Sequence, residues 1–301
     1  MQTLLQNLLN GIAAGSIYAL IALGYTMVYG ILKLINFAHG DVFMIGSFVG
    51  FYSGNYLAKH NAGAPALVNA GLTLALAMVI CGLLGYLNER VAYRPLRNVP
   101  RIASLITAIG VSFLLEYGGQ FVFGADPKFF PTLVEKKIIN FGGVTTTNYQ
   151  FIVLGVSLVF MVALQFLIYG TKFGRAMRAV SFNFETAALM GIPVNRIVSF
   201  TFVIGSMLAA VAGILYGLSY PKIDPLMGIM PGLKAFVAAV LGGIGNVPGA
   251  VVGGLLIGVI ESFIGGSSLS NYREAIAFVI LIVILLFRPS GLFGKYQPEK
   301  V

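Results

Sequence analysis

The sequence predicts an all-α integral membrane protein, a polytopic helical bundle of about 8–9 transmembrane segments with one or two broken or short helices. Hydrophobic residues make up 58% of the 301 residues and charged residues only 10%, against about 25% charged in an ordinary globular domain. Apolar runs recur along the chain, with the basic residues in short clusters between them. This composition excludes a soluble enzyme with a charged surface, a disordered chain and a secreted disulfide scaffold, and the single cysteine, Cys81, cannot form an internal disulfide.

The first predicted helix lies near the N-terminus. Residues Met1 to Ile31 carry no charged side chain and lack the basic segment and cleavage site of a signal peptide, so we expect a retained membrane segment. About 20 mostly apolar residues cross the hydrocarbon core. The predicted spans are Leu8–Leu32, Asp41–Leu57, Pro65–Leu87, Ile102–Gly124, Tyr149–Tyr169, Ile197–Tyr220, Gly249–Phe263 and Arg273–Phe287. One further stretch, Gly232–Leu241, is too short for a full span and predicts a half-helix or a steeply placed short helix.

The connecting segments predict the orientation. Three of them are basic: Arg90, Arg94, Arg97 and Arg101 in the first, Lys172, Arg175, Arg178 and Arg196 in the second, and Arg288, Lys295 and Lys300 in the tail. The loop 125–148 is nearly balanced in charge. By the positive-inside rule the basic segments and the C-terminus are cytoplasmic, and loop 125–148 is external. Alternation then places the N-terminus outside, in the periplasm, provided that Gly232–Leu241 counts as a crossing. If this stretch is instead a re-entrant half-helix, the number of crossings falls by one and the N-terminus would lie on the cytoplasmic side.

The chain is predicted to form a single transmembrane domain over residues 1–301, because no loop is long enough to hold a soluble domain. Its net charge of +9 would suggest nucleic acid in a soluble protein. Here the lipid bilayer explains the basic clusters, and no nucleic-acid partner is expected. Two apolar stretches are interrupted, at Asn36–Gly40 and at Gly242–Gly249, and paired interruptions point to a transporter's central cavity.

Several chemical classes are not predicted. The sequence lacks the phosphate-binding pattern G-x-x-x-x-G-K-[ST], so the chain is not expected to hold ATP itself. Its two histidines, His39 and His60, belong to no cluster with metal-ligand spacing, and no Ser, His and acid combination has catalytic character. We therefore expect no enzyme activity, no metal and no cofactor in this chain.

The most informative segment is the cytoplasmic loop 171–196. Its alanines, the acid near a helix start and Gly191 predict a short surface helix with small side chains on one side and a C-terminal stop. Small side chains let the groove of a partner approach the helix backbone closely. The arginines would then lie at lipid headgroups or face acidic partner residues. The alternative is an amphipathic loop that only anchors the fold at the interface.

This loop resembles the Glu-Ala-Ala-(three residues)-Gly loop of ABC importer permeases through Glu185, Ala187, Ala188 and Gly191, with Thr186 in place of the first Ala. Three further segments, Gly30–Asp41, Gly232–Gly245 and Arg288–Gly294, are similar to those of permeases from branched-chain amino-acid ABC importers. The resemblance covers essentially the whole chain, and the length suits the smaller of two paired permeases.

The resemblance implies both a function and a set of partners. The loop would be the coupling segment that docks into an ATPase, and its residues are Arg175, Arg178, Glu185, Ala187, Ala188 and Gly191. The implied partners are a second homologous permease, two ATP-binding cassette subunits that use ATP and Mg, and an external periplasmic protein that binds leucine, isoleucine or valine. The implied location is a bacterial inner membrane.

Polar residues within or beside the predicted spans are candidates for the translocation path or its gate. A charge at the membrane centre costs about 2.5–3.5 kcal/mol on insertion scales, so it rarely lacks a role. The candidates are Asn36, His39, Asp41, Glu116, Gln120, Gly242, Gly243 and Gly245. For each a structural role is the alternative: Asp41 can cap a helix, Glu116 can bond a neighbouring helix, and the glycines can allow close packing. Glu261 lies near the outer end of its span and could reach the interface.

Other functions remain open from the sequence. Permeases of the same architecture for urea or short amides look alike. A carrier or channel working alone would need intramembrane acids for ion coupling, and only Glu116 and Glu261 qualify. A purely structural membrane subunit would tolerate changes in loop 171–196.

Overall fold

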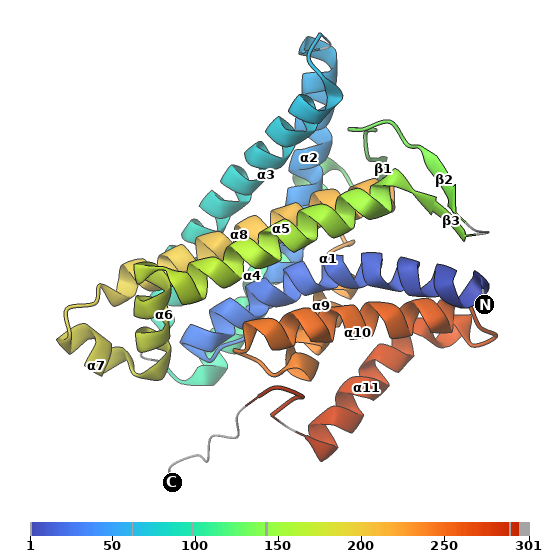
Figure 1. Ribbon diagram of the computed structural model, residues 1–301. Helices are drawn as coiled ribbons and strands as arrows, with labels where there is room; N and C mark the ends of the chain where they lie inside the picture. The colour runs from blue at the N-terminus through green and yellow to red at the C-terminus, as the bar shows by residue number, and fades with distance from the viewer. Residues whose placement is uncertain (1, 62, 98, 142–143, 289, 295–301) are drawn as a thin grey trace.

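A computed structural model describes residues 2–61, 63–97, 99–141, 144–288 and 290–294. Long helices dominate it, with two small antiparallel sheets (Figure 1). The bundle helices are α1 (Gln2–Leu32), α2 (His39–His60), α3 (Ala66–Asn88), α4 (Arg101–Phe123), α5 (Asn148–Gly170), α8 (Val194–Ser219), α9 (Ile229–Gly242), α10 (Val247–Gly265) and α11 (Arg273–Phe287). The shorter elements are α6 (Lys172–Phe182), α7 (Phe184–Leu189), a π-helical turn at Glu89–Tyr93, and 3-10 helical turns at Arg94–Leu96 and Ser270–Tyr272. The strands are β1 (Lys128–Phe129), β2 (Ile138–Phe141), β3 (Val144–Thr147) and β4 (Lys222–Ile223), with β1 paired to β4 and β2 to β3.

The predicted polytopic helical bundle is confirmed. Seven helices among the described residues are long and apolar enough to cross a membrane, and α2 and the 14-residue α9 accompany them. The predicted and observed ranges differ mainly at helix ends, and most at the first one, where α1 begins at Gln2 rather than Leu8. The polar N-terminal turns of α1 are helical because they have tertiary partners: Gln6 accepts a hydrogen bond from the Thr145 amide of β3 (3.0 Å).

The bundle has two distinct ends. At one, which we call the hairpin end, the β2–β3 hairpin lies beside the start of α1, and Asn10 of α1 accepts a hydrogen bond from Gln150 of α5 (2.6 Å). At the other, the α6–α7 end, Asn195 of α8 accepts a hydrogen bond from Arg97 (2.6 Å). Figure 1 shows the N-terminus at the first end and α6 and α7 at the second. The N-terminus and loop 125–148 therefore lie at the end opposite to loop 171–196.

Two helices of the bundle, α2 and α9, begin inside it rather than at an end. Each follows a non-helical stretch that ends in a turn, 33–38 before α2 and 224–228 before α9. The two helix starts pack together, because a Cβ on Gly40 would lie 2.7 Å from the Gly228 carbonyl oxygen and 3.2 Å from Gly232 Cα. The interruption that faces Asn36–Gly40 is therefore 224–228, whereas Gly242–Gly249 is the turn between α9 and α10. Sequence alone could not make this pairing, since it depends on which backbones touch.

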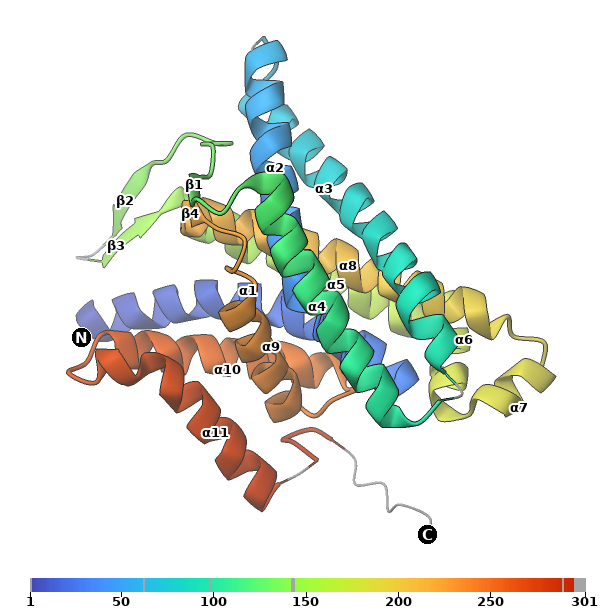
Figure 2. The ribbon, with the colours of Figure 1, turned by 180° about the vertical axis from the view of Figure 1, so that it is seen from behind.

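The centre of the bundle is built from α1 and its neighbours α8 and α10. The side chains of α1 and α8 are mostly buried, whereas α3, α4, α5 and α11 carry many exposed apolar side chains. Figure 2 shows α4 and α11 on the outside of the bundle. Helices α1 and α10 meet through small residues: a Cβ on Gly11 would lie 2.6 Å from Val259 Cα, and one on Gly15 2.8 Å from Leu255 Cα. Such contacts let two helix backbones approach closely in a membrane.

We expect Gly15→Val to destabilise the bundle, because its side chain would force α1 away from α10. Overpacking of this kind costs about 1–3 kcal/mol or more. The measurement is the thermal unfolding temperature of the purified protein in detergent. The matched control is Gly155→Val on α5, where a Cβ meets nothing within 4 Å. Equal melting temperatures for the two variants would contradict the packing argument.

Candidate functional site

The α6–α7 segment is a well-capped pair of helices. Thr171 caps α6 by accepting a hydrogen bond from the Gly174 amide (3.1 Å), and Asn183 caps α7 by accepting one from the Thr186 amide (2.8 Å). At the other end of α7, Gly191 adopts a φ of 79°, a left-handed conformation that favours glycine. The Gly191 amide donates to Ala188 O (2.9 Å) and the Ile192 amide to Ala187 O (3.1 Å), which closes the helix. These contacts fix the shape of a segment that projects from the end of the bundle (Figure 1).

The exposed surface of this segment includes a cluster of large apolar side chains. Ala187 is buried against the bundle, whereas Glu185, Ala188 and Gly191 are exposed. Three large side chains stand out beside them, with Phe182 88%, Leu189 87% and Met190 78% exposed. Sequence analysis missed these three residues, although the Leu189–Met190 pair inside the loop motif was a visible signal. A cluster of large apolar side chains on a projecting segment is typical of a protein contact surface.

The two candidate arginines of α6 differ in their surroundings. Arg178 donates a hydrogen bond to Ile168 O, and its guanidinium lies 5.3 Å from the centre of the Tyr169 ring. Both partners are in the last turn of α5, where a positive charge is favourable. Arg178 therefore ties α6 to the end of α5, while Arg175 is exposed on the surface of α6.

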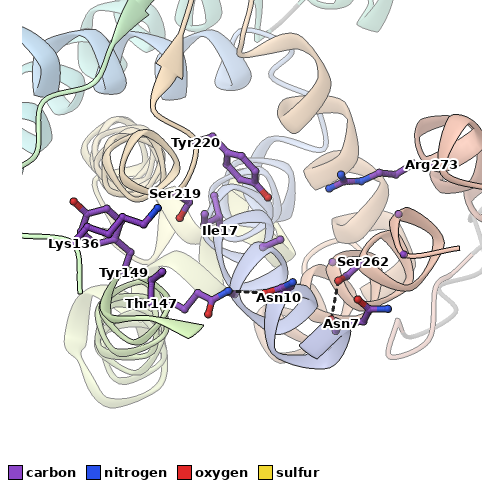
Figure 3. Close-up of a pocket in the computed structure, with 16 residues that line it drawn as sticks. Asn7, Asn10, Ile17, Lys136, Thr147, Tyr149, Ser219, Tyr220, Ser262 and Arg273 are labelled. Atoms are coloured by element: carbon purple, nitrogen blue, oxygen red, sulfur yellow. Dashed lines mark hydrogen bonds between the residues drawn. The ribbon is translucent and has the colours of Figure 1, made fainter. Parts of the chain in front are cut away.

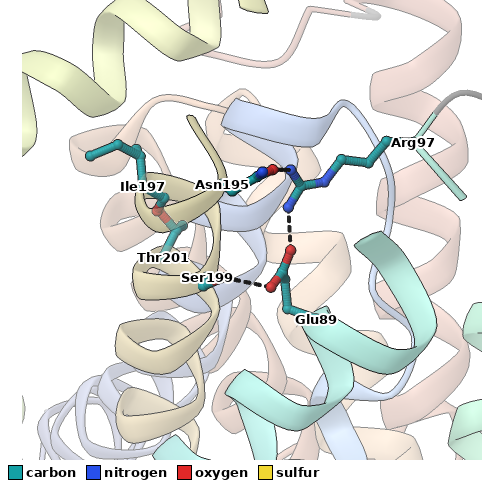
Figure 4. Close-up of polar contacts among 6 residues, drawn as sticks. All are labelled: Glu89, Arg97, Asn195, Ile197, Ser199 and Thr201. Carbon is teal, nitrogen blue, oxygen red and sulfur yellow. Dashed lines mark hydrogen bonds and ion pairs between the residues drawn. The ribbon is translucent and has the colours of Figure 1, made fainter. Parts of the chain in front are cut away.

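A buried ion pair supports the base of this segment (Figure 4). Glu89, where α3 ends, is fully buried and accepts hydrogen bonds from Arg97 and from Ser199 of α8 (2.5 Å). Arg97 also bonds to Asn195. Burial lowers the pKa of the Arg97 guanidinium, and the neighbouring Glu89 opposes that shift. Because buried charges need partners, this cluster holds the starts of α4 and α8 against α3, a role that the sequence did not reveal for Glu89.

A groove lies next to the same cluster. Its volume is about 690 Å³, and residues from the end of α3, from the α7–α8 junction and from the first turns of α8 line it, among them Tyr86, Ala188 and Phe200. The groove lies at the α6–α7 end and joins the exposed face of α7 to the bundle. A partner that contacts α7 can therefore also reach α3 and α8.

The structure brings two of the candidate path residues together. Asp41, in the first turn of α2, accepts a hydrogen bond from Ser112 of α4 (2.5 Å) and is buried. Glu116, one turn further along α4, is buried and faces the same carboxyl group. Gln120 follows one turn later and is half-buried. Two carboxyl groups therefore meet between α2 and α4, within helices that are expected to lie in the membrane.

Asn36 and His39 face other parts of the bundle. Asn36 accepts a hydrogen bond from the Tyr93 hydroxyl (2.8 Å), which connects the break before α2 to the end of α3. The His39 ring packs against α1, where it lies 4.8 Å from the Tyr25 ring and occupies the space over Gly24. Both side chains hold the interrupted segment in place.

The candidate glycines lie in the turn between α9 and α10. Gly243 and Gly245 have φ values of 98° and 93°, which favour glycine, and Gly242 packs against the backbone of Gly249. The C-terminal segment covers this turn, since Leu292 and Phe293 donate backbone hydrogen bonds to Leu241 (2.8 Å) and Gly242 (3.2 Å). Of the predicted tail residues, Pro289, Lys295 and Lys300 lie outside the described residues.

A second buried charge cluster ties three helices together near the hairpin end. Glu261 of α10 accepts from Lys234 of α9 (2.8 Å), and the same carboxyl oxygen lies 2.7 Å from Arg273 Nε of α11. The side chains of Lys234 and Glu261 are almost completely buried. Sequence analysis singled out Glu261 but not its two partners, because they lie 27 and 12 residues away on different helices.

Across the residues that the structure describes, no group of three or more His, Cys, Asp or Glu side chains could hold a metal ion. The site features are instead a projecting apolar segment at one end, paired charges inside, and a carboxyl pair between two helices.

Comparison with known proteins gives consistent results over nearly the whole chain. Residues 7–285 match the family model described as branched-chain amino acid transport system / permease component. The chain is 43% identical to the high-affinity branched-chain amino acid transport system permease protein BraD of Pseudomonas aeruginosa, over 99% of this chain and 98% of the relative. It is also 43% identical to the corresponding permease protein LivH of Escherichia coli, over 99% and 97%. A more distant relative is the autoinducer 2 import system permease protein LsrC of Yersinia pseudotuberculosis, 26% identical over 91% and 75%.

We expect Glu261→Ala to destabilise the protein strongly, because it leaves Lys234 buried without its carboxylate. Removing one partner of a buried ion pair costs about 3–5 kcal/mol. The measurement is again the thermal unfolding temperature in detergent. Glu135→Ala is the control, since the exposed pair of Glu135 with Lys137 (4.0 Å) contributes little. A loss no larger than that of the control would contradict the structural role of Glu261.

Proposed function

This chain belongs to the branched-chain amino acid transport permease family, and we propose that it is the membrane-spanning permease of an ATP-driven importer for leucine, isoleucine and valine. The proposal is supported by the full-length similarity to permeases named for branched-chain amino acids. As a transport permease component the chain is a subunit and not an enzyme, and a permease of this family is not expected to need a cofactor. ATP and Mg would be used by separate ATPase subunits.

The chain is a multi-pass membrane protein, and we propose its orientation from its charges. The α6–α7 end carries the basic segments around Arg94 and Arg175, so it is assigned to the cytoplasm. The hairpin end and the N-terminus are then external. Helices α2 and α9 complete their crossings together with the non-helical stretches 33–38 and 224–228, which makes nine crossings by α1–α5 and α8–α11. We infer a single transmembrane domain over residues 1–301 in a bacterial inner membrane.

The observation that carries the coupling role is the exposed apolar surface of the α6–α7 segment. Phe182, Leu189 and Met190 project beside Glu185 and Gly191, at the end assigned to the cytoplasm. We propose that this surface docks into one of two ATP-binding cassette subunits, with Arg175 at the contact and Arg178 holding α6 to α5. Ala187 faces the bundle, so its small size serves packing of α7, whereas Ala188 lets the partner approach.

The remaining contacts of the complex are proposed from the exposed helices and from the hairpin end. The apolar faces of α3, α4, α5 and α11 have room for lipid and for a second, homologous permease. An external binding protein would deliver the amino acid at the hairpin end. Among the predicted path residues, we propose that Asp41 and Glu116 form a gate between α2 and α4, with Gln120 one turn further along α4. Asn36, His39, Gly242, Gly243 and Gly245 then position the backbone around it.

The direct test is transport by the complete complex in liposomes. Leucine should accumulate only when the external binding protein and ATP are present, and unlabelled isoleucine or valine should compete while urea does not. Accumulation without ATP would instead support a carrier working alone. Competition by urea but not by leucine would assign the permease to short amides.

We expect Leu189→Asp to reduce both co-purification of the ATPase subunits and leucine uptake at least tenfold, at normal expression. The reason is that burying a leucine side chain in a partner contributes about 1.5–3 kcal/mol, and a carboxylate there must be desolvated. The conservative variant Leu189→Ile should retain both properties. Wild-type uptake and ATPase binding by Leu189→Asp would contradict the docking role.

A further inference from the structure

The hairpin end contains a cavity that the docking and gating proposals do not use (Figure 3). Its volume is about 430 Å³, within the range of pockets that hold small ligands. Residues from α1, α5, α8, α10 and the start of α11 surround it, together with Lys136 and Thr147 from the segment before α5. It therefore lies between central helices of the bundle and not on the lipid-facing side of one helix.

The cavity has a polar rim and an apolar floor. Asn7 and Asn10 lie in the outer turns of α1, and Gln150 in the first turn of α5, at the level of the hairpin. Further along α1 toward the centre come Ala13, Ala14 and Ile17, opposite Gly258 of α10. A ligand in this space meets hydrogen-bonding groups at its outer end and aliphatic groups at its inner end.

The rim carries positive charge. Figure 3 shows Lys136 and Arg273 on opposite sides of the cavity, with Tyr220 between them. Of the described residues that line the cavity, none is an Asp or Glu. The nearby Glu261 contacts Arg273 but is shared with the buried Lys234, so two basic side chains share one carboxylate, and Lys136 adds a further positive charge at the rim. The uncompensated charge favours an anionic group on the ligand.

The cavity does not continue between α1 and α10. Just below the floor, Gly15 lies against Leu255, and Gly254 lies against Ala19, with no room for a methyl group. A ligand that enters from the hairpin end is therefore held above a closed helix contact. Passage beyond it requires α1 and α10 to separate.

We propose that this cavity receives the zwitterionic amino acid that the permease transports, on the external side, before it crosses. The carboxylate lies between Lys136 and Arg273, the ammonium group stays at the polar outer end of the cavity, and the branched side chain rests on Ala14 and Ile17. This inference rests on the proposed function, because the importer supplies the amino acid. A charged rim over an aliphatic floor matches a ligand that has two charged groups at one end and a hydrocarbon branch at the other.

The test measures binding of radiolabelled leucine to the full chain in nanodiscs, and leucine uptake by the complete importer. Lys136→Gln should weaken binding and raise the KM of uptake at least fivefold with little change in kcat. Lys136→Arg, which keeps the charge, should restore both. The matched control is Lys137→Gln, because the neighbouring Lys137 does not line the cavity and pairs with Glu135 outside it.

Ligand analogues identify the group that is bound. 4-Methylpentanoate, which keeps the carboxylate and lacks the ammonium group, should compete with leucine, whereas leucinamide, which lacks the carboxylate, should compete at least fivefold less well. Equal competition by leucinamide would overturn the proposal, and so would wild-type binding and KM in Lys136→Gln. Leucine binding that disappears when anionic lipid is added to the nanodisc would assign the cavity to a lipid phosphate and also overturn it. Absence of ATP-driven leucine uptake by the unmodified importer is a different result, because it refutes the proposed function itself.

Discussion

Gly40 at the start of α2 lies against Gly228 and Gly232 at the start of α9, and the architecture of the bundle depends on this contact. Two chain segments, 33–38 and 224–228, interrupt the helices of a bundle that we assign to the membrane, where backbone groups outside a helix need partners within the protein. Such segments are tolerated only where protein surrounds them. With no side chain between the two backbones, each helix start shields the other, and turn hydrogen bonds such as His39 N–H to Asn36 O (3.1 Å) and Met227 N–H to Asp224 O (3.1 Å) pair some of the freed backbone groups.

The two interrupted helix pairs, α1–α2 and α8–α9, run in opposite directions through the bundle. α1 starts at the hairpin end and α8 at the α6–α7 end. After each of them the chain turns back into the bundle, where the next helix, α2 or α9, begins. Inverted pairs of this kind are common in transporters, because two similar halves can rock around a central site. Glycine packing brings the backbones of α1 and α10 into close contact at the centre of this arrangement.

Charge is distributed in two different ways along the bundle. Inside it, Glu89 and Glu261 are each paired with basic side chains from other segments, which fixes helix ends to one another. At the surface, the two ends differ in character. The α6–α7 end presents Phe182, Leu189 and Met190 to a partner, while the hairpin end encloses a cavity with Lys136 and Arg273 at its rim. The ends are thus chemically suited to different contacts.

The sequence by itself determined the membrane class, nearly all of the helices and the family. These follow from local properties: apolar runs of bilayer length, basic clusters between them, and motifs such as Glu185 to Gly191. Only the tertiary structure decided which residues act together. It paired Asp41 with Glu116, Glu261 with Lys234 and Arg273, and the break at Asn36–Gly40 with 224–228, and it exposed Leu189 while burying Ala187. The physical reason is that such pairings depend on distances between segments far apart in the chain, which hydrophobicity and spacing do not encode.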